Sequence, residues 1–272
     1  MYSAKVIEDS VNKFGIRAIT IAICYPRFIL AETNTHRMFS RSTSSSRAIP
    51  IMKMIEQVWN RPVIPVYWGK NKSGMQAAEE LTGMGKWLAT QTWVLASKFA
   101  CGFALALYGL GLHKQIGNRL LEPWCWAHTV ITSTEWDNFF ALRNHEMAQP
   151  EFKKLAEIMG DAIDESVPKY LANGEWHLPY VTEDERKEFS LLDCIKFSTA
   201  RCARVSYLTH DKKAPSLEND MKLHDILVGS DPKHASPSEH QLVPARTDAF
   251  FFNVRAWKSY RFYIEHNEVT KI

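Results

Sequence analysis

An apolar run that leads directly into a polar loop is the feature that most constrains this chain. Residues 19–30 (ITIAICYPRFIL) are rich in β-branched and aromatic side chains, which favour a buried strand. Residues 35–50 (THRMFSRSTSSSRAIP) follow, with a serine cluster between Arg37 and Arg47. Hydroxyl groups and forked guanidinium groups together suit an anion such as phosphate. The spacing matches neither a P-loop nor G-x-G-x-x-G, and a plain serine-rich surface loop is the alternative.

Composition narrows the class of protein. A chain of 272 residues forms one large domain or two small ones. Hydrophobic residues at 46% and nine tryptophans supply an ample core, which excludes a disordered chain. A net charge of +3 is too small to attract nucleic acid by bulk electrostatics.

The five cysteines include no C-x-x-C pair and none in a recognisable nucleophile context. Their odd number indicates reduced, buried thiols of a cytoplasmic protein and not a disulfide framework. The first ten residues lack an apolar signal core, and no run of about 18 apolar residues occurs. The most apolar stretch, residues 93–112, is predicted to be a buried core helix and not a membrane span.

Helical and extended patterns are mixed along the rest of the chain, which indicates an α/β (α+β) fold. A polar lead-in is expected at residues 1–14, a strand at 124–133 and a polar linker at 172–187. Helices are expected at residues 51–59, 74–110, 114–121, 151–171, 191–207 and 217–228. One more helix is expected after Thr134, which would cap it, and this helix carries Asn138 and Arg143.

Two features near the C-terminus allow more than one interpretation. Residues 250–265 mix aromatic and basic side chains, a pattern of single-stranded nucleic acid binding or of a docked amphipathic terminus, and we favour the second. His234 and His240 are six residues apart, but no third ligand of suitable spacing follows. No metal site is therefore predicted.

Three blocks of sequence resemble the flavin-dependent thymidylate synthases. Residues 26–47 (PRFILAETNTHRMFSRSTSSSR) are similar to the family signature R-H-R-x-x-S-x-N-E-x-S-x-R after an apolar strand. Positions that match are His36, Arg37, Ser40, Ser45 and Arg47. Residues 118–124 (NRLLEPW) and 132–152 (TSTEWDNFFALRNHEMAQPEF) are similar to a second family block. Its matching positions are Arg119, Asn138, Arg143, Ala148 and Gln149.

The third block lies in an unusual place. Residues 200–211 (ARCARVSYLTHD) and 234–241 (HASPSEHQ) resemble a segment that comes first in the family. The chain is thus similar to a circular permutant, with one domain over residues 1–272 and the new join at about 172–190. A permutation of this kind is physically reasonable when the original termini lie close together at the surface.

The resemblance implies a central, mostly antiparallel sheet flanked by long helices, in a homotetramer with FAD bound where subunits meet. The implied enzyme is a methyltransferase that converts dUMP to dTMP at C5. Its implied cofactors are FAD, NADPH and 5,10-methylenetetrahydrofolate. Folate and a pyrimidine deoxynucleoside monophosphate are thus the expected partners, with no membrane and no nucleic acid. The expected location is the cytoplasm, or the host cytoplasm for a phage protein, since the loop variant resembles phage-borne members.

Roles carry over from the family position by position. The resemblance assigns FAD binding to His36, Arg37, Thr43, Asn138 and His240. It assigns nucleotide binding to Glu32, Ser45, Ser46, Arg47, Arg119 and Arg143. Arg119 would contact the phosphate. Arg143 and Ser45 are the expected catalytic residues, with Arg143 against the pyrimidine carbonyl edge, where it would stabilise charge as C5 becomes nucleophilic.

The chain also departs from the family pattern. The changed positions are Thr35, Ser42, Thr43, Thr132, Thr134 and Met147, and Glu32 replaces a glutamine of the nucleotide site. An ionised carboxylate only accepts hydrogen bonds, which would favour a cytosine amino group. Two alternatives therefore stay open. One is methyl or hydroxymethyl transfer to dCMP or dUMP for modified DNA, and the other is a non-catalytic relative that binds nucleotide or nucleic acid.

Overall fold

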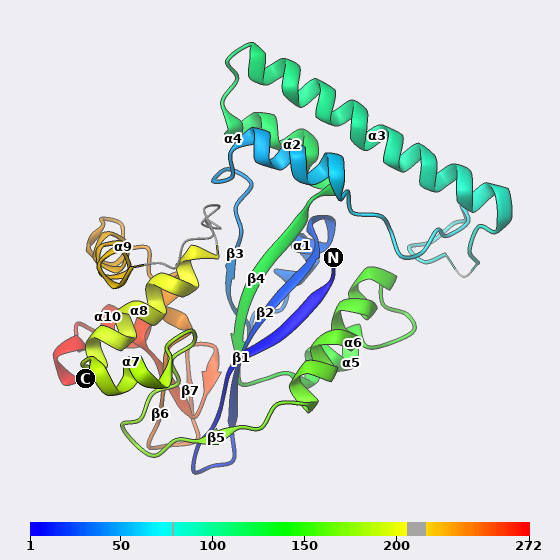
Figure 1. Cartoon of the computed structure of the whole chain (residues 1–272). Coiled ribbons are helices and arrows are strands. Elements are labelled where there is room, and N and C mark those ends of the chain that lie inside the picture. The colour runs from blue at the N-terminus through cyan, green and yellow to red at the C-terminus, as the bar shows by residue number, and fades with distance from the viewer. Residues whose placement is uncertain (78, 206–215) are drawn as a thin grey trace.

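The computed structural model describes residues 1–77, 79–205 and 216–272 and has a mixed α/β architecture (Figure 1). Its centre is a five-stranded sheet of order β3-β4-β2-β1-β5. The strands are β1 Ser3–Val11, β2 Arg17–Pro26, β3 Ser40–Thr43, β4 Trp126–Ser133 and β5 Lys169–Tyr170. Neighbouring strands are antiparallel, except that β1 and β5 are parallel. The expected central, mostly antiparallel sheet is confirmed.

Helices surround the sheet in three groups (Figure 1). One group beyond an end of the sheet contains α2 Ile51–Asn60, α3 Gly83–Gly109 and α4 Lys114–Gly117. A second covers one face with α5 Asp137–Arg143 and α6 Pro150–Asp164. The C-terminal half supplies the third, which contains α7 Glu183–Glu188, α8 Leu191–Arg204, α9 Leu217–Gly229 and α10 Tyr260–Glu265.

Short elements connect these groups. The helix α1 Leu30–Thr33 follows the 3-10 turn η1 Arg27–Ile29. Further 3-10 turns are η2 Asn118–Trp124, η3 Ser236–Glu239 and η4 Val269–Lys271. The short strands are β6 Leu242–Pro244, β7 Phe250–Phe251, β8 Val254–Arg255 and β9 Trp257–Ser259, which pair as β6–β9 and β7–β8.

The main hydrophobic core lies between the sheet and α5–α6. Alternate residues of β2, from Ile19 to Tyr25, point into it because successive strand side chains face opposite sides. Phe139 from α5 and Phe152 from α6 pack against them. A second cluster, around Trp176 and other residues of the C-terminal half, forms a smaller core of its own.

The opposite face of the sheet carries a chain of buried hydrogen bonds, which we call the buried polar seam. Its members, in order, are Ser10, His177, Thr20, Thr132, His240 and Ser42. Successive contacts measure 2.9, 2.8, 2.6, 2.8 and 3.0 Å. The hydroxyl groups come from β1, β2, β4 and β3, and both histidines come from the C-terminal half. The seam therefore fastens that half to the sheet.

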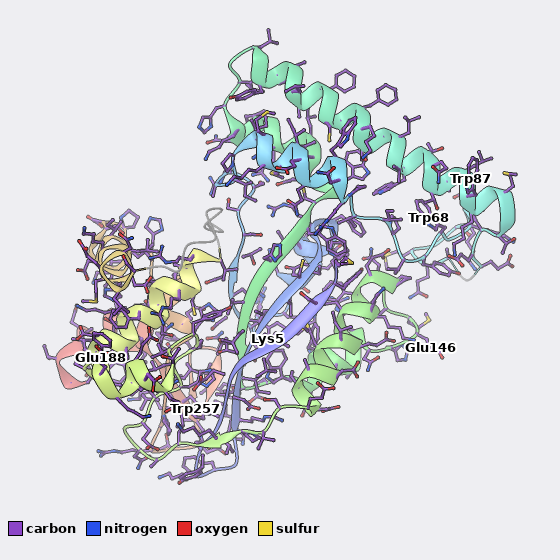
Figure 2. All side chains as sticks on the ribbon, viewed as in Figure 1. Lys5, Trp68, Trp87, Glu146, Glu188 and Trp257 are labelled. Atoms are coloured by element: carbon purple, nitrogen blue, oxygen red, sulfur yellow. The ribbon has the colours of Figure 1, made fainter. Side chains whose placement is uncertain are left out.

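Both seam histidines are neutral at pH 7. Burial lowers the pKa of His177 and of His240 to about 3. A neutral imidazole has one donor and one acceptor nitrogen, so each ring can link two hydroxyl groups. Figure 2 shows the side chains of this region, and Trp257 lies nearby, fully buried, with its indole N–H donated to the Ile16 carbonyl oxygen at 3.2 Å.

Two segments that we expected to be polar connections are integral parts of the fold. Residues 1–14 contain β1, which pairs with β2 along its whole length. The linker expected at 172–187 contains the buried residues Trp176, His177 and Leu178 and the start of α7. Both segments were predicted to be connections because their average composition is polar, although they contain residues that pair or pack within the fold. The join expected at about 172–190 stays a prediction.

The helix expected at residues 74–110 forms only from Gly83 to Gly109, as α3, and it is not buried. On this helix, Ser97, Cys101 and Ala104 are buried against its neighbours, and most other side chains face solvent. Within the described part of the chain it is the helix that is long and apolar enough to cross a membrane. The prediction of a buried core helix is therefore wrong, because apolar composition does not distinguish a core from an exposed surface.

Other expectations differ in detail. The Thr134 hydroxyl does not cap α5 and accepts a hydrogen bond from the Arg255 amide at 2.9 Å. The helix expected at residues 151–171 ends as α6 at Asp164. Residues 250–265 form a hairpin, β9 and the short α10, and not one amphipathic helix. The helix expected at 191–207 is α8, and residues 206–211 of the third sequence block lie outside the described residues.

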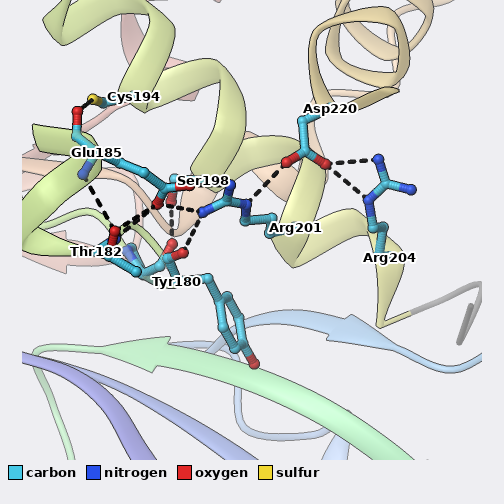
Figure 3. Close-up of polar contacts among 9 residues, drawn as sticks. Tyr180, Thr182, Glu185, Cys194, Ser198, Arg201, Arg204 and Asp220 are labelled. Carbon is cyan, nitrogen blue, oxygen red and sulfur yellow. Dashed lines mark hydrogen bonds and ion pairs between the residues drawn. The ribbon is translucent and has the colours of Figure 1, made fainter. Parts of the chain in front are cut away.

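An ion network fixes α7, α8 and α9 to one another (Figure 3). The fully buried Asp220 carboxylate accepts from Arg201 at 2.9 Å and from Arg204 at 3.0 and 2.6 Å. Arg201 also forks onto Glu185 at 2.8 and 2.6 Å and donates to the Tyr180 carbonyl oxygen. The hydrogen bonds from Arg201 lower the pKa of the Glu185 carboxyl to about 2. Each buried charge in this network thus has a partner, as burial requires.

Candidate functional site

A cavity of about 550 Å³ lies where the polar loop after β3 meets α8, α9 and η3. Its residues are Arg41, Ser42, Thr43, Ser45, Arg47, Ala48, His113, Gln115, Ala203, Leu227, His234, Ser236 and Pro237. Among these described lining residues two are arginines and none is acidic. A positive, hydroxyl-rich cavity of this size suits a small anionic ligand. We call it the arginine cavity.

The backbone of the polar loop is held by β4. The Ser44 amide donates to the His128 carbonyl oxygen at 2.8 Å, and the His128 amide donates back to the Ser44 hydroxyl at 3.0 Å. Arg27 donates to the Ser44 carbonyl oxygen at 3.0 Å. Next along the chain, the side chains of Ser45 and Arg47 line the cavity without a hydrogen-bond partner in the described residues. Both are therefore available to a ligand.

Ser46 and Arg119 point to a different place. One carboxylate oxygen of Glu122 accepts from Ser46 at 2.6 Å, from Arg119 at 2.8 Å and from Arg27 at 3.0 Å. Burial would raise the pKa of Glu122, but the Ser46 hydroxyl and the two arginines outweigh it and lower the pKa. Neither Ser46 nor Arg119 lines the arginine cavity. In a single copy of the chain, Ser46 is bonded to Glu122, and this contact holds the polar loop against η2.

His36 and Arg143 form a second group. The Arg143 Nε–H donates to the His36 Nε2 at 2.9 Å, and the guanidinium lies 4.5 Å above the Phe152 ring. His36 is buried edge-on against Phe139, with ring centroids 5.0 Å apart. Burial, with the nearby Arg143 and Arg41, lowers the pKa of His36 to about 4. The neutral ring accepts a hydrogen bond from the Arg143 Nε–H, and the outer guanidinium nitrogens have no protein partners in the described residues.

Arg41 connects two cavities. It lines the arginine cavity and also a second one of about 430 Å³, together with Arg37, Phe252, Asn253 and Arg261. One of its guanidinium nitrogens donates to the His36 carbonyl oxygen at 2.7 Å. Sequence reasoning missed Arg41 because the resemblance gave it no role. Its place in β3, between the inward-facing Ser40 and Ser42, was the available signal.

The five residues that the resemblance assigns to FAD do not meet in one copy of the chain. Arg37 lines the second cavity, Thr43 lines the arginine cavity, and Asn138 is exposed on α5. His36 is bonded to Arg143, and both nitrogens of His240 are bonded within the buried polar seam. A single copy therefore does not assemble a flavin pocket from these residues.

Glu32 and the departures from the family pattern have defined surroundings. One carboxylate oxygen of Glu32 is buried without a hydrogen-bond partner in the described structure. Thr35 donates to the Glu32 carbonyl oxygen at 2.6 Å. Thr132 belongs to the buried polar seam, and Met147 is exposed. An unpaired buried carboxylate oxygen is energetically costly. A ligand or a partner that donates a hydrogen bond to this oxygen would remove that cost.

Cysteine and metal chemistry have little support. All five cysteines are free and buried, and burial raises the pKa of each thiol, that of Cys125 to about 12. The expected burial of the thiols is confirmed, and none is a poised thiolate nucleophile. Over residues 1–77, 79–205 and 216–272, no three histidine, cysteine or acidic side chains cluster as a metal site would require.

Comparisons with known proteins find similar structures but no similar sequences. No protein-family model and no curated protein matches the chain. A UMP/dUMP methylase, PolB from Streptomyces cacaoi, is 14% identical in two structures with 5-Br UMP and 5-Br dUMP, with TM-scores of 0.47 and 0.48. Each alignment covers 61% of this chain and 89% or 90% of that one.

Thymidylate synthase X from Helicobacter pylori, solved with FAD and dUMP, is 17% identical with a TM-score of 0.39. That alignment covers 54% of this chain and 67% of the other. At these identities and TM-scores the likeness decides neither family nor activity. The chemistry of this chain must therefore be argued from its own residues.

Proposed function

We propose that this protein is a methyltransferase that acts at C5 of a pyrimidine nucleoside monophosphate. The reaction is the conversion of dUMP to dTMP with FAD, NADPH and 5,10-methylenetetrahydrofolate. The arginine cavity is the observation that carries the proposal. It places Arg47 and Ser45, without protein partners, beside Arg41 and away from acidic side chains in the described lining. This loop is also the one that resembles the nucleotide cradle of the flavin-dependent thymidylate synthases.

Charge explains why a phosphate fits this cavity. A guanidinium group can donate two parallel hydrogen bonds to phosphate oxygens, and hydroxyl donors such as Ser45 add to them. Arg41 is already oriented by the His36 carbonyl oxygen, so less side-chain entropy is lost when it meets an anion. Ser46 and Arg119 would act through the shape of the loop. Arg119 would reach the phosphate only by leaving Glu122.

The pyrimidine ring and the flavin require groups that a single copy keeps apart. In the proposed enzyme, Arg143 donates to a pyrimidine carbonyl oxygen while His36 holds its guanidinium in place. Arg37, Thr43 and Asn138 are the residues that remain available to hold FAD, which would supply the reducing equivalents. A homotetramer with its flavin at a subunit junction would bring them together. The proposed substrate is a free nucleotide, so the protein would act in the cytoplasm, that of the host if it is phage-encoded.

Flavin content is the first test. The visible spectrum of the purified protein is recorded, and NADPH is then added without oxygen. The proposal expects a bound yellow flavin that NADPH bleaches, followed by tritium release from [5-³H]dUMP when methylenetetrahydrofolate is present. A colourless protein that refuses added FAD would contradict it. Salt-dependent binding of single strands by such a protein would indicate the non-catalytic relative.

Arg47→Ala tests the nucleotide cradle. We expect the Kd for dUMP, measured by calorimetry, to rise by about 10–100-fold, because a charge-assisted contact contributes roughly 1.5–3 kcal/mol. Arg61→Ala is the matched control, since Arg61 is an exposed arginine next to α2 that lines no described cavity. An unchanged Kd for Arg47→Ala would remove the arginine cavity from nucleotide binding.

Glu32 favours a second candidate, methyl or hydroxymethyl transfer to dCMP. Its unpaired buried oxygen would accept a hydrogen bond from the cytosine amino group. If this reading is correct, the wild-type protein turns over dCMP faster than dUMP, and Glu32→Gln reverses the preference by about 10-fold or more. Competition between the two nucleotides measures this ratio. If the wild-type protein and Glu32→Gln both strictly prefer dUMP, the dCMP candidate is excluded and the dUMP proposal is unaffected.

A further inference from the structure

The outward side of α3 is a long apolar surface. The helix has 27 residues, so it is about 40 Å long, and it forms the outermost layer of its group (Figure 1). Figure 2 shows side chains, Trp87 among them, that project from it away from the rest of the molecule. Large apolar side chains that are roughly half or more exposed are Met84, Trp87, Leu88, Leu95, Phe99, Phe103, Leu105 and Tyr108.

This surface carries no charge. Lys86 and Lys98 are the charged residues of α3, and both are used within the chain. Lys86 pairs with Glu80 at 2.7 Å, and Lys98 donates to the Trp59 carbonyl oxygen and lies over the Trp59 ring. The residues of α3 that are exposed are all neutral. An identical surface can therefore lie against it without repulsion, whereas a charged partner would find no counter-charge.

The seam that faces directly outward has a symmetric pattern. Its members are Met84, Leu88, Gln91, Leu95, Phe99, Gly102 and Ala106, and all are exposed. Successive members are four, three, four, four, three and four residues apart, which is the three-or-four-residue spacing of a helix–helix contact. The spacing reads the same in both directions from Leu95. An antiparallel copy of the helix, centred on Leu95, would therefore present every seam position to another seam position.

Side-chain size is complementary at the two ends of the seam. In that arrangement Met84 faces Ala106 of the other copy and Leu88 faces Gly102, while nearer the axis Gln91 faces Phe99 and Leu95 meets Leu95. Gly102 has no packing reason within one copy, because a Cβ there would have no atom within 4 Å. Glycine inside a helix costs about 1 kcal/mol relative to alanine. A closely approaching second helix would explain why the site is small.

We propose that α3 pairs with α3 of a second copy of this chain, antiparallel, around a two-fold axis at Leu95. A two-fold contact is self-complementary, as this seam is. Side chains of this size carry on the order of 150–250 Å² each, so the exposed ones on α3 supply roughly 1,000 Å², against about 800 Å² per partner in a standard interface. This interface is independent of the proposed chemistry and would exist in a non-catalytic relative.

Cysteine cross-linking tests both the contact and its direction. Leu95→Cys is expected to give a covalent dimer on mild oxidation at micromolar protein, because this residue meets itself on the axis. Leu88→Cys and Gly102→Cys should not cross-link alone but should do so when mixed. Leu142→Cys, exposed on α5, and the wild-type protein with its buried cysteines are the controls. Cross-linking of Leu88→Cys with itself would overturn the antiparallel arrangement.

Leu95→Glu tests the same surface without a cysteine. Light scattering should show the molar mass falling by half, with the circular dichroism spectrum unchanged because the side chain lies outside the core. A wild-type protein that is monomeric at tens of micromolar and gives no Leu95→Cys dimer would overturn the proposal. So would a wild-type monomer that binds neutral phospholipid vesicles, since α3 would then meet lipid.

Discussion

Arg143→Ala is expected to lower kcat/KM for methylation of the nucleotide by about 100-fold or more, the cost of removing one donor that stabilises developing charge. In the proposed reaction, two contacts would hold Arg143 in place before the nucleotide binds. Its Nε–H is bound by the neutral His36, and its guanidinium lies flat on Phe152. The two outer guanidinium nitrogens of Arg143 therefore have no protein partner in the described residues and can bind a substrate oxygen. A group oriented before the reaction pays little entropy when the substrate arrives.

Three measurements separate this catalytic role from a structural one. Bound flavin should be unchanged in Arg143→Ala, and the thermal midpoint should fall by only a few degrees, because the lost contacts are one hydrogen bond to His36 and the packing on Phe152. Leu142→Ala, an exposed neighbour on α5, should keep full turnover. Arg143→Lys should recover little, since an ammonium group cannot both bind His36 and fork onto a carbonyl edge. Full turnover in Arg143→Ala would remove Arg143 from the mechanism.

The arginine and hydroxyl groups that line the arginine cavity could be predicted as a candidate anion site because their chemistry is local. Arg47, Ser45 and their neighbours lie within a few residues, and hydroxyl and guanidinium groups show their preference without a fold. The pairing of His36 with Arg143 could not be predicted, because 107 residues separate them and the fold alone brings them together. The resemblance named both residues but assigned His36 to the flavin, whereas in this structure it positions Arg143.

The fold shows the same division. The sheet and most helices follow hydrophobic periodicity, and β4 and α2 form close to where they are expected. The strand expected at residues 19–30 ends earlier, at Pro26 of β2, and the chain continues as η1 and α1. The role of His177 could not be predicted for two reasons. It lies in a stretch whose composition is mostly polar, and its two partners, Ser10 and Thr20, are near the other end of the chain. For α3 the helical pattern was visible in the sequence but its exposure was not, since a buried helix and an exposed apolar helix have the same composition.

The buried histidines should make the protein sensitive to mild acid. The pKa of His36 is about 4 and those of His177 and His240 about 3, all lowered from 6.5 mainly by burial. Below pH 6.5 these histidines bind protons in the unfolded chain but stay neutral in the folded chain. The free energy of unfolding therefore falls as pH falls from about 6.5 towards 4, and these groups give no slope above about pH 7.5. Glu8 opposes the trend, because burial raises its pKa.

The size of this effect approaches the whole stability of a domain. Each proton changes the free energy of unfolding by a little over 1 kcal/mol per pH unit, so two to three protons remove roughly 3–5 kcal/mol between pH 6.5 and 5. Typical stabilities are about 5–15 kcal/mol. Urea unfolding at fixed protein concentration, repeated from pH 5 to 8, measures the slope.

Two variants identify the groups responsible. His240→Gln keeps a donor and an acceptor in the buried polar seam but does not titrate, so the slope should lose about one proton. Thr132→Val breaks the seam on both sides without removing a titratable group. It should therefore lower stability by a similar amount at every pH and leave the slope unchanged. A flat stability between pH 5 and 7 in the wild-type protein would mean that the histidines are not held neutral, and that the seam does not fasten the two halves as its hydrogen bonds indicate.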